Sequence, residues 1–282
     1  MKVTTLVENV SHAENLAEQY GLSLFVETEH GNVVVDMGQD ETSLGNLVEL
    51  GLDVTDIDAL FVSHNHFDHV GGLQTYIDAT AEKRVPVYIS AGVGSTLFSK
   101  RIFRRRRIVS RNEAIAQNRD RMVFVSDAAE IFPNVYACRV KDASHEYVCK
   151  DRKLKMLNEE GHLVSDNFDH ELYLAVIEEG GVKVVSPCSH TGIVNILKDA
   201  EARFALPVTG FVGGLHLRGA SSRSLNCSMS HVLNIADQLS KFPLKNLYTC
   251  HCTGYKAFSI LKERLSDSVS FTYFHTGKTF TI

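Results

Sequence analysis

The sequence lacks the features that mark secreted, membrane-embedded and disordered proteins. Only five of its 282 residues are proline and 44% are hydrophobic, which excludes a long disordered region and favours a packed globular protein. No uncharged apolar run approaches the length of a bilayer-spanning helix, and residues 1–9 lack the apolar core and cleavage site of a signal peptide. The sequence therefore predicts a soluble, cytoplasmic protein.

Cysteine pairs and a strong charge of either sign are also missing. The six cysteines are scattered and include no Cys-x-x-Cys pair, which favours reduced thiols over disulfides. A net charge of −5 gives no general attraction to nucleic acid or to anionic membranes. We therefore expect a small-molecule substrate and neither of those partners, and the sequence leaves a homo-oligomer open.

Strand and helix patterns alternate along the chain. Strand-like runs at 22–28 and 32–36 form a hairpin, and runs at 172–177 and 182–185 form a second one. In each half the hairpin is followed by histidine-containing corners between a strand and a helix. This order predicts an α/β (α+β) fold, in one domain of residues 1–282, with two sheets packed face to face and helices outside.

The middle of the chain is less regular. Residues 92–166 form a variable, partly inserted segment in this interpretation, and the polar stretch 141–166 within it resembles an extended loop.

The densest group of ligand-type side chains is His64, His66, Asp68 and His69, between an apolar strand and a glycine pair. Alternate residues of an extended segment share a face, so His64 and His66 can hold one ion. Beyond the turn, Asp68 and His69 can face a second. Such ligands suit zinc, with iron, manganese, cobalt or nickel as alternatives. Ordinary surface polar residues are the competing interpretation, but four such side chains in six residues favour a metal site.

Two later histidines occupy matching corners. His190 follows the strand 182–186 and precedes a helical run, and His251 follows the strand 245–248 and precedes another. A lone histidine is more often structural than a ligand, but two at equivalent corners favour metal ligation.

The spacing His-x-His-x-Asp-His followed by Gly-Gly resembles the signature of the metallo-β-lactamase superfamily. The resemblance implies a four-layer αββα sandwich and a site for one or two divalent ions. It also implies that Asp36, at the end of an early strand, is a buried residue that orients a ligand. The ligands so implied are His64, His66 and His190 for the first ion and Asp68, His69 and His251 for the second.

One position departs from the superfamily pattern. Most members carry a bridging aspartate between the third and last histidine motifs, and His216 stands there in this chain. His216 is then a metal ligand, a proton donor to substrate or a wall of the pocket. The motifs at 188–197, 213–217 and 251–254 are similar to the branch of 7,8-dihydropterin-6-yl-methyl-4-(β-D-ribofuranosyl)aminobenzene-5′-phosphate synthase-like metallo-hydrolases.

This resemblance implies a metal-dependent hydrolase or related transferase that uses metal-activated water on a small, anionic or phosphorylated, pterin-like substrate. Asp68 would orient the water or take its proton, and His216 would stabilise charge or protonate a leaving group. A phosphodiesterase or lactonase would share the metal ligands. A di-iron redox enzyme would prefer a carboxylate in place of His66, and a non-catalytic sensing protein would keep the metal without turnover.

Three cysteines and one loop lie near these motifs. Cys250 and Cys252 flank His251, and in an extended segment both would point away from its face. We therefore expect them to be packing residues, and we expect Cys188 to be structural as well. Asp169 is a candidate substrate-binding residue, and either Asp169 or His170 could reach the pocket from its loop.

A basic run at 101–111 stands out in an acidic chain. It is either a solvated helix face or an anion-binding patch, because guanidinium groups pair with phosphate. If Arg105 and Arg106 bind substrate, the double substitution Arg105→Ala and Arg106→Ala will raise KM for a phosphorylated substrate. Steady-state kinetics measures this, and an unchanged KM removes the hypothesis.

Overall fold

The alternation of apolar side chains along the strands determines how the layers stack. Val33 and Val35 face one core and Val34 faces another, and Val184 and Val185 divide in the same way. Successive strand residues point to opposite faces of a sheet. Because both faces are apolar, each sheet is covered on both sides. The result is the four-layer αββα sandwich that the sequence predicts.

The computed structural model describes residues 1–100, 106–110, 112–149, 153–265 and 269–282. The first sheet has seven strands and begins with antiparallel pairs, after which β3, β4, β5 and β8 run parallel. In sheet order these strands are β18 (Thr279–Thr281), β1 (Lys2–Val7), β2 (Ser23–Thr28), β3 (Gly31–Val35), β4 (Ala59–Phe61), β5 (Val87–Ser90) and β8 (Met122–Val125).

The second sheet also has seven strands, and it repeats the scheme of a hairpin followed by parallel strands from β14 to β17. In sheet order these strands are β17 (Ser270–Tyr273), β16 (Asn246–Thr249), β15 (Val208–Gly213), β14 (Gly181–Ser186), β13 (Tyr173–Glu178), β10 (Val135–Cys138) and β9 (Ala128–Phe132).

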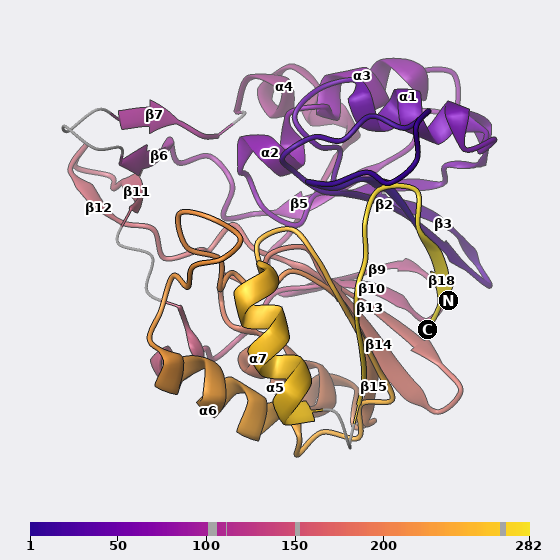
Figure 1. The fold of residues 1–282 in the computed structure, drawn as a ribbon. Coiled ribbons are helices and arrows are strands. Elements are labelled where there is room, and N and C mark those ends of the chain that lie inside the picture. The colour runs from indigo at the N-terminus through magenta and orange to yellow at the C-terminus, as the bar shows by residue number, and fades with distance from the viewer. Residues whose placement is uncertain (101–105, 111, 150–152, 266–268) are drawn as a thin grey trace.

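Helices cover the outer face of each sheet (Figure 1). The first sheet is covered by α1 (Thr42–Glu49), α3 (Leu73–Ala79) and α4 (Asn112–Gln117), and the second by α5 (Ile193–Phe204), α6 (Met229–Leu239) and α7 (Tyr255–Leu265). The described helical structure also includes four short turns: α2 (Phe67–Val70), and the 3₁₀ turns Val54–Asp56, Arg119–Arg121 and His145–Tyr147.

The segment 141–166 is not the extended loop that we expected. It contains β11 (Leu154–Leu157) and β12 (Leu163–Ser165), which join β6 (Leu97–Lys100) and β7 (Arg106–Ile108) in a third, four-stranded sheet. These strands are short and all four contain polar residues, so no periodicity marked them. The backbone of Arg106 lies in β7, which contradicts a helix face there, and Arg105 lies outside the described residues.

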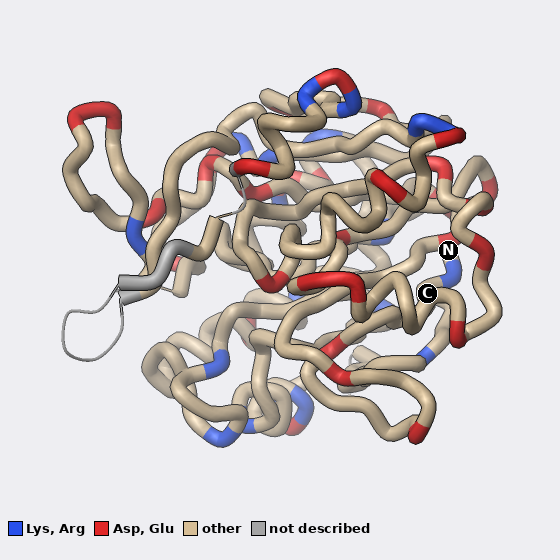
Figure 2. Tube along the Cα trace, turned by 90° about the horizontal axis from the view of Figure 1, so that it is seen from above, with Lys and Arg blue, Asp and Glu red and all other residues tan. Residues whose placement is uncertain are grey.

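Lys and Arg positions alternate with Asp and Glu positions along the backbone trace in the view of Figure 2. None of the described helices has the length and apolar character needed to cross a membrane.

The candidate ligand corners gather at one edge because of the strand directions. β4 and its parallel neighbours end at the same edge of the first sheet, and β14, β15 and β16 do so in the second. The carboxyl ends of parallel strands are the usual place for a binding site in α/β folds. The chain segments that follow β4, β14, β15 and β16 carry the histidines.

A pair of matched substitutions tests the helix-covered core. Leu197 on α5 is fully buried, whereas Leu233 on α6 is 39% exposed. Leu197→Ala is expected to lower the free energy of unfolding by about 2–5 kcal/mol, because it removes packed methyl groups and leaves a cavity. Leu233→Ala carries the same change in helix propensity and serves as the control. Urea unfolding measures both, and an equal cost for the two would contradict the packing described.

Candidate metal centre

The loop after β4 is fixed in place by the ends of β2 and β3. Leu22 N donates a hydrogen bond to Asp68 O (3.2 Å) and Met37 N donates one to His69 O (2.7 Å). Gly21 has a φ of +153°, and a Cβ there would lie 2.4 Å from Asp68 O. Only glycine therefore permits this approach, and it sets the position of the ligand loop.

The structure brings the six residues together in two groups of three. Within each group the potential ligand atoms lie within 4.8 Å of one another, and all six side chains are buried. We call them the first triad (His64, His66 and His190) and the second triad (Asp68, His69 and His251).

The spacing of the nitrogen atoms fits a tetrahedral metal ion. The Nε2 atoms of His64 and His190 are 3.3 Å apart, and those of His69 and His251 are 3.2 Å apart. Two nitrogens bound at about 2.0–2.1 Å to one tetrahedral ion lie roughly 3.3 Å from each other. Asp68 Oδ2 lies 3.5 Å from His251 Nε2, on the same side of the site.

Hydrogen bonds at Nδ1 orient three of the histidines. His64 Nδ1 contacts Ser63 Oγ (2.8 Å), and His251 Nδ1 contacts Asn9 Oδ1 (2.9 Å). Ser63 Oγ donates its own proton to Asp36, and Asn9 Oδ1 can only accept. Both Nδ1 atoms therefore carry the proton, which leaves the Nε2 lone pairs directed into the site.

Asp36 has the buried, orienting position that the resemblance implied. Its Oδ2 accepts a hydrogen bond from His69 Nδ1 (2.7 Å), and its Oδ1 accepts one from Ser63 N (2.7 Å). The carboxylate is fully buried. It thereby fixes the tautomer of His69 in the same way, with Nε2 unprotonated in the neutral ring.

The first triad has the charge state that metal binding needs. Burial, with repulsion from neighbouring histidines, holds the pKa of His64 and His190 well below the ordinary value. Burial also lowers the pKa of His66, and His66 Nε2 has no hydrogen-bond partner in the described part of the chain. These rings are neutral at pH 7, and the buried His66 Nε2 lacks the partner that a metal ion would supply.

The second triad is ionised. Burial alone would raise the pKa of Asp68, but His69 and a hydrogen bond from His251 outweigh it and lower that pKa. Burial opposes protonation of His69, yet Asp68 and Asp36 raise the pKa of that ring overall. Asp68 and the His69 ring thus stabilise each other's charged forms, and this point of the site favours a cation.

Two buried glutamates hold the backbone of the distant ligands, and the sequence analysis missed both. Glu171 accepts hydrogen bonds from His190 N (2.6 Å) and Thr191 N (2.7 Å), and Glu8 accepts one from His251 N (2.7 Å). No local pattern marks them, because their partners are 19 and 243 residues away.

The loop before β13 reaches the site through His170 and not through Asp169. Asp169 is half exposed, pairs with Arg139 and does not line the cavity, so the structure gives it no contact with a substrate there. His170 accepts a hydrogen bond from Asn65 N (3.2 Å), and Asp166 Oδ2 lies 3.2 Å from His170 Nε2 and 3.7 Å from His66 Nε2. Asp166 was not predicted.

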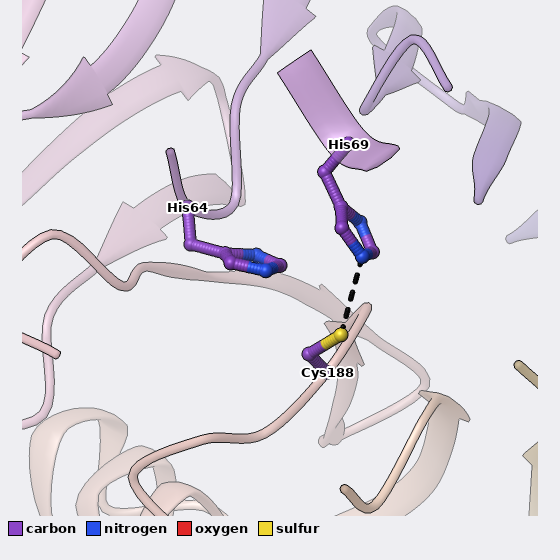
Figure 3. A group of neighbouring side chains, drawn as sticks. All are labelled: His64, His69 and Cys188. Carbon is purple, nitrogen blue, oxygen red and sulfur yellow. Dashed lines mark hydrogen bonds between the residues drawn. The ribbon is translucent and has the colours of Figure 1, made fainter. Parts of the chain in front are cut away.

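The cysteines differ from the expectation. His251 has a φ of +49°, so the chain turns there and the alternation of an extended strand does not apply. Cys252 lines the cavity, and its sulfur lies within 4.8 Å of ligand atoms of His251 and Cys188. Of the two cysteines that flank His251, Cys250 alone packs in the core. Cys188 Sγ lies 3.2 Å from His69 Nε2 (Figure 3).

A cavity of about 360 Å³ opens over both triads, a size suited to a small molecule. His216 lies beyond the end of β15, lines this cavity, and packs on His190 with ring centroids 4.2 Å apart. Arg218 and Lys153 line it too. Arg105 lies outside the described residues, and the side chain of Arg106 is not described.

The sequence is similar to a family of metal-dependent proteins and to one named enzyme. The model of the metallo-beta-lactamase superfamily matches residues 17–206. The 7,8-dihydropterin-6-methyl-4-(beta-D-ribofuranosyl)-aminobenzene-5'-phosphate synthase of Methanocaldococcus jannaschii is 28% identical over 290 residues, which cover 99% of this chain and 95% of that protein.

Solved structures share the fold. A metal-dependent hydrolase of the beta-lactamase superfamily has a TM-score of 0.81 at 23% identity and covers 100% of this chain and 99% of its own. Zn(2+)-bound PqqB from Methylobacterium extorquens has a TM-score of 0.56 at 12% identity, with 100% of both chains covered. On the family match and the shared fold, the chain belongs to the metallo-beta-lactamase superfamily.

Proposed function

We propose that this protein is a metal-dependent hydrolase or related transferase that acts on a small, anionic, phosphorylated and pterin-like substrate. One observation carries the proposal: the Nε2 atoms of His69 and His251 face each other across 3.2 Å, while hydrogen bonds place the protons of both rings on Nδ1. Two facing lone pairs repel unless a cation lies between them. The proposal that the substrate is pterin-like rests on the similarity to the synthase of Methanocaldococcus jannaschii.

Zinc is the ion that fits the ligand types best, with iron, manganese, cobalt and nickel as alternatives. When bound, such an ion activates water and polarises a carbonyl or phosphoryl oxygen. His64, His66 and His190 would hold one ion, and Asp68, His69 and His251 the other.

The charge of Asp68 limits its role. Because its pKa is lowered, Asp68 remains a carboxylate at neutral pH and is a weak base. It is suited to bind metal and to accept a hydrogen bond that orients the attacking water. His216, against His190 at the cavity wall, is the nearer candidate for donating a proton to a leaving group.

The cavity lining supports an anionic substrate. Arg218 and Lys153 are cationic and line the same cavity as both triads. The Arg218 guanidinium carbon lies 5.3 Å from the centre of the Tyr20 ring, a cation–π contact that holds it in place. A guanidinium group can pair with two phosphate oxygens at once.

Removing one histidine of the first triad tests the metal site. His66→Ala and His190→Ala are each expected to lose about one bound ion per chain and to abolish turnover, because three protein ligands are the minimum for such a site. Metal analysis and a panel of phosphorylated pterin, phosphodiester and lactone substrates measure both properties. His30→Ala, at an exposed turn, is the control.

Full turnover by a metal-free His66→Ala protein would refute the metal-dependent mechanism. A wild-type protein that holds metal but turns over no substrate on the panel would favour a sensing protein.

A second substitution tests the anionic substrate. Arg218→Ala is expected to raise KM for phosphorylated substrates by roughly ten- to a hundredfold, because a hydrogen bond to a charged group contributes about 1.5–3 kcal/mol. Arg264→Ala removes an exposed arginine that pairs with Asp237 and is the control. Steady-state kinetics measures KM, and an equal KM for Arg218→Ala and wild type would contradict this role.

A further inference from the structure

Cys188 lies between the two triads. Its sulfur forms a group with His64 of the first triad and His69 of the second, in which all three potential ligand atoms lie within 4.8 Å of one another (Figure 3). The side chain is 4% exposed and lines the cavity over the site. A sulfur this close to one histidine of each triad lies where a ligand shared by the two ions would lie.

We propose that Cys188, as a thiolate, is a ligand of the metal centre and takes the role that a bridging aspartate has in most members of the superfamily, where this chain has His216. This inference rests on the metal centre proposed above. On binding, a metal–sulfur bond forms and the thiol proton passes to solvent, so a divalent ion gains one anionic ligand.

The single lone pair of His69 Nε2 favours the thiolate form of Cys188 once a metal ion is bound. Asp36 holds the proton of His69 on Nδ1, so Nε2 has a single lone pair. That lone pair can accept the Cys188 S–H, whose sulfur is 3.2 Å away, or bind a metal ion, but not both. Metal binding therefore leaves the buried S–H without its acceptor, beside a cation that favours the thiolate.

The distance is also that of two ligands of one ion. A nitrogen and a sulfur bound to the same tetrahedral zinc, at about 2.0–2.1 and 2.3 Å, lie roughly 3.6 Å apart. The 3.2 Å between Cys188 Sγ and His69 Nε2 is a few tenths of an ångström shorter. A small rotation of the cysteine side chain meets the ideal value.

Charge favours an anion at this point. Of the six triad residues only Asp68 is a carboxylate, beside five imidazoles, so a thiolate would give the two divalent ions a second anionic ligand. The residue in the expected place of the bridging carboxylate, His216, packs against the His190 ring and belongs to none of the candidate metal groups found in the described ranges. Cys188 is therefore the better-placed source of a second negative charge.

Cys252 is the competing thiol. It forms a group with His251 and Cys188, which places it at the second triad. Its sulfur accepts a hydrogen bond from His216 N at 3.3 Å, a contact that holds Cys252 toward the cavity wall. We therefore assign the bridging position to Cys188 and leave Cys252 as the internal control.

Substitution of the metal by cobalt tests the thiolate ligand and the metal centre separately. Protein is stripped of metal, reconstituted with Co²⁺, and its absorption spectrum recorded for wild type, Cys188→Ser, Cys252→Ser and Cys250→Ser. Cys250 is fully buried in the core between the sheets. The wild type is expected to show visible d–d bands and a near-ultraviolet thiolate-to-cobalt charge-transfer band, and Cys188→Ser alone is expected to lose the charge-transfer band.

The outcomes distinguish a failure of the Cys188 ligand from a failure of the proposed metal centre. Visible bands without a charge-transfer band in the wild type would overturn the thiolate ligand and leave the metal centre intact. Loss of the charge-transfer band in Cys252→Ser but not in Cys188→Ser would assign the ligand to Cys252 and overturn the proposal. Absence of bound cobalt would overturn the proposed function as well. The wild-type spectrum alone shows whether a thiolate binds the cobalt ion, even if Cys188→Ser fails to fold.

Discussion

Repulsion between buried, facing lone pairs is the constraint on which this structure depends. Asp36 and Asn9 each hold a histidine proton on the outer nitrogen, so the inner nitrogens of His69 and His251 meet across 3.2 Å. An arrangement of this kind is stable only around a cation, be it a proton or a metal ion. The fold thus stores, in its hydrogen bonds, an energetic preference for positive charge at one buried point.

The groups that create this preference come from distant parts of the chain and are held by the backbone as well as by side chains. Glu8 and Glu171 anchor the amides of His251 and His190. Several residues around the site adopt the left-handed conformation that non-glycine residues usually avoid: Asp36, Phe168, Ser189, His216 and His251. The surrounding packing offsets this strain, and the ligands are thereby aimed before any ion arrives.

The sequence predicted what local patterns encode. The hairpins, the ligand loop from His64 to His69 and the corners at His190 and His251 were predicted because strand periodicity and ligand spacing are local properties. Cys252 was misplaced because the turn at His251 breaks the strand alternation. Asp166, Glu8 and Glu171 were not predicted, since only tertiary packing brings them to the site. The strands β11 and β12 were missed because they belong to a small, four-stranded sheet. Their residues do not show the apolar alternation by which a strand is predicted.

The wide sequence separation of these groups also bears on how the protein is made. His251 depends on Glu8 and Asn9, and the terminal strand β18 closes the first sheet against β1. Contacts of such long range form slowly, because the chain entropy lost in closing them comes before the stabilisation. A growing chain therefore carries an incomplete ligand set until the segment that contains His251 has been made, and loading of both metal ions follows that step.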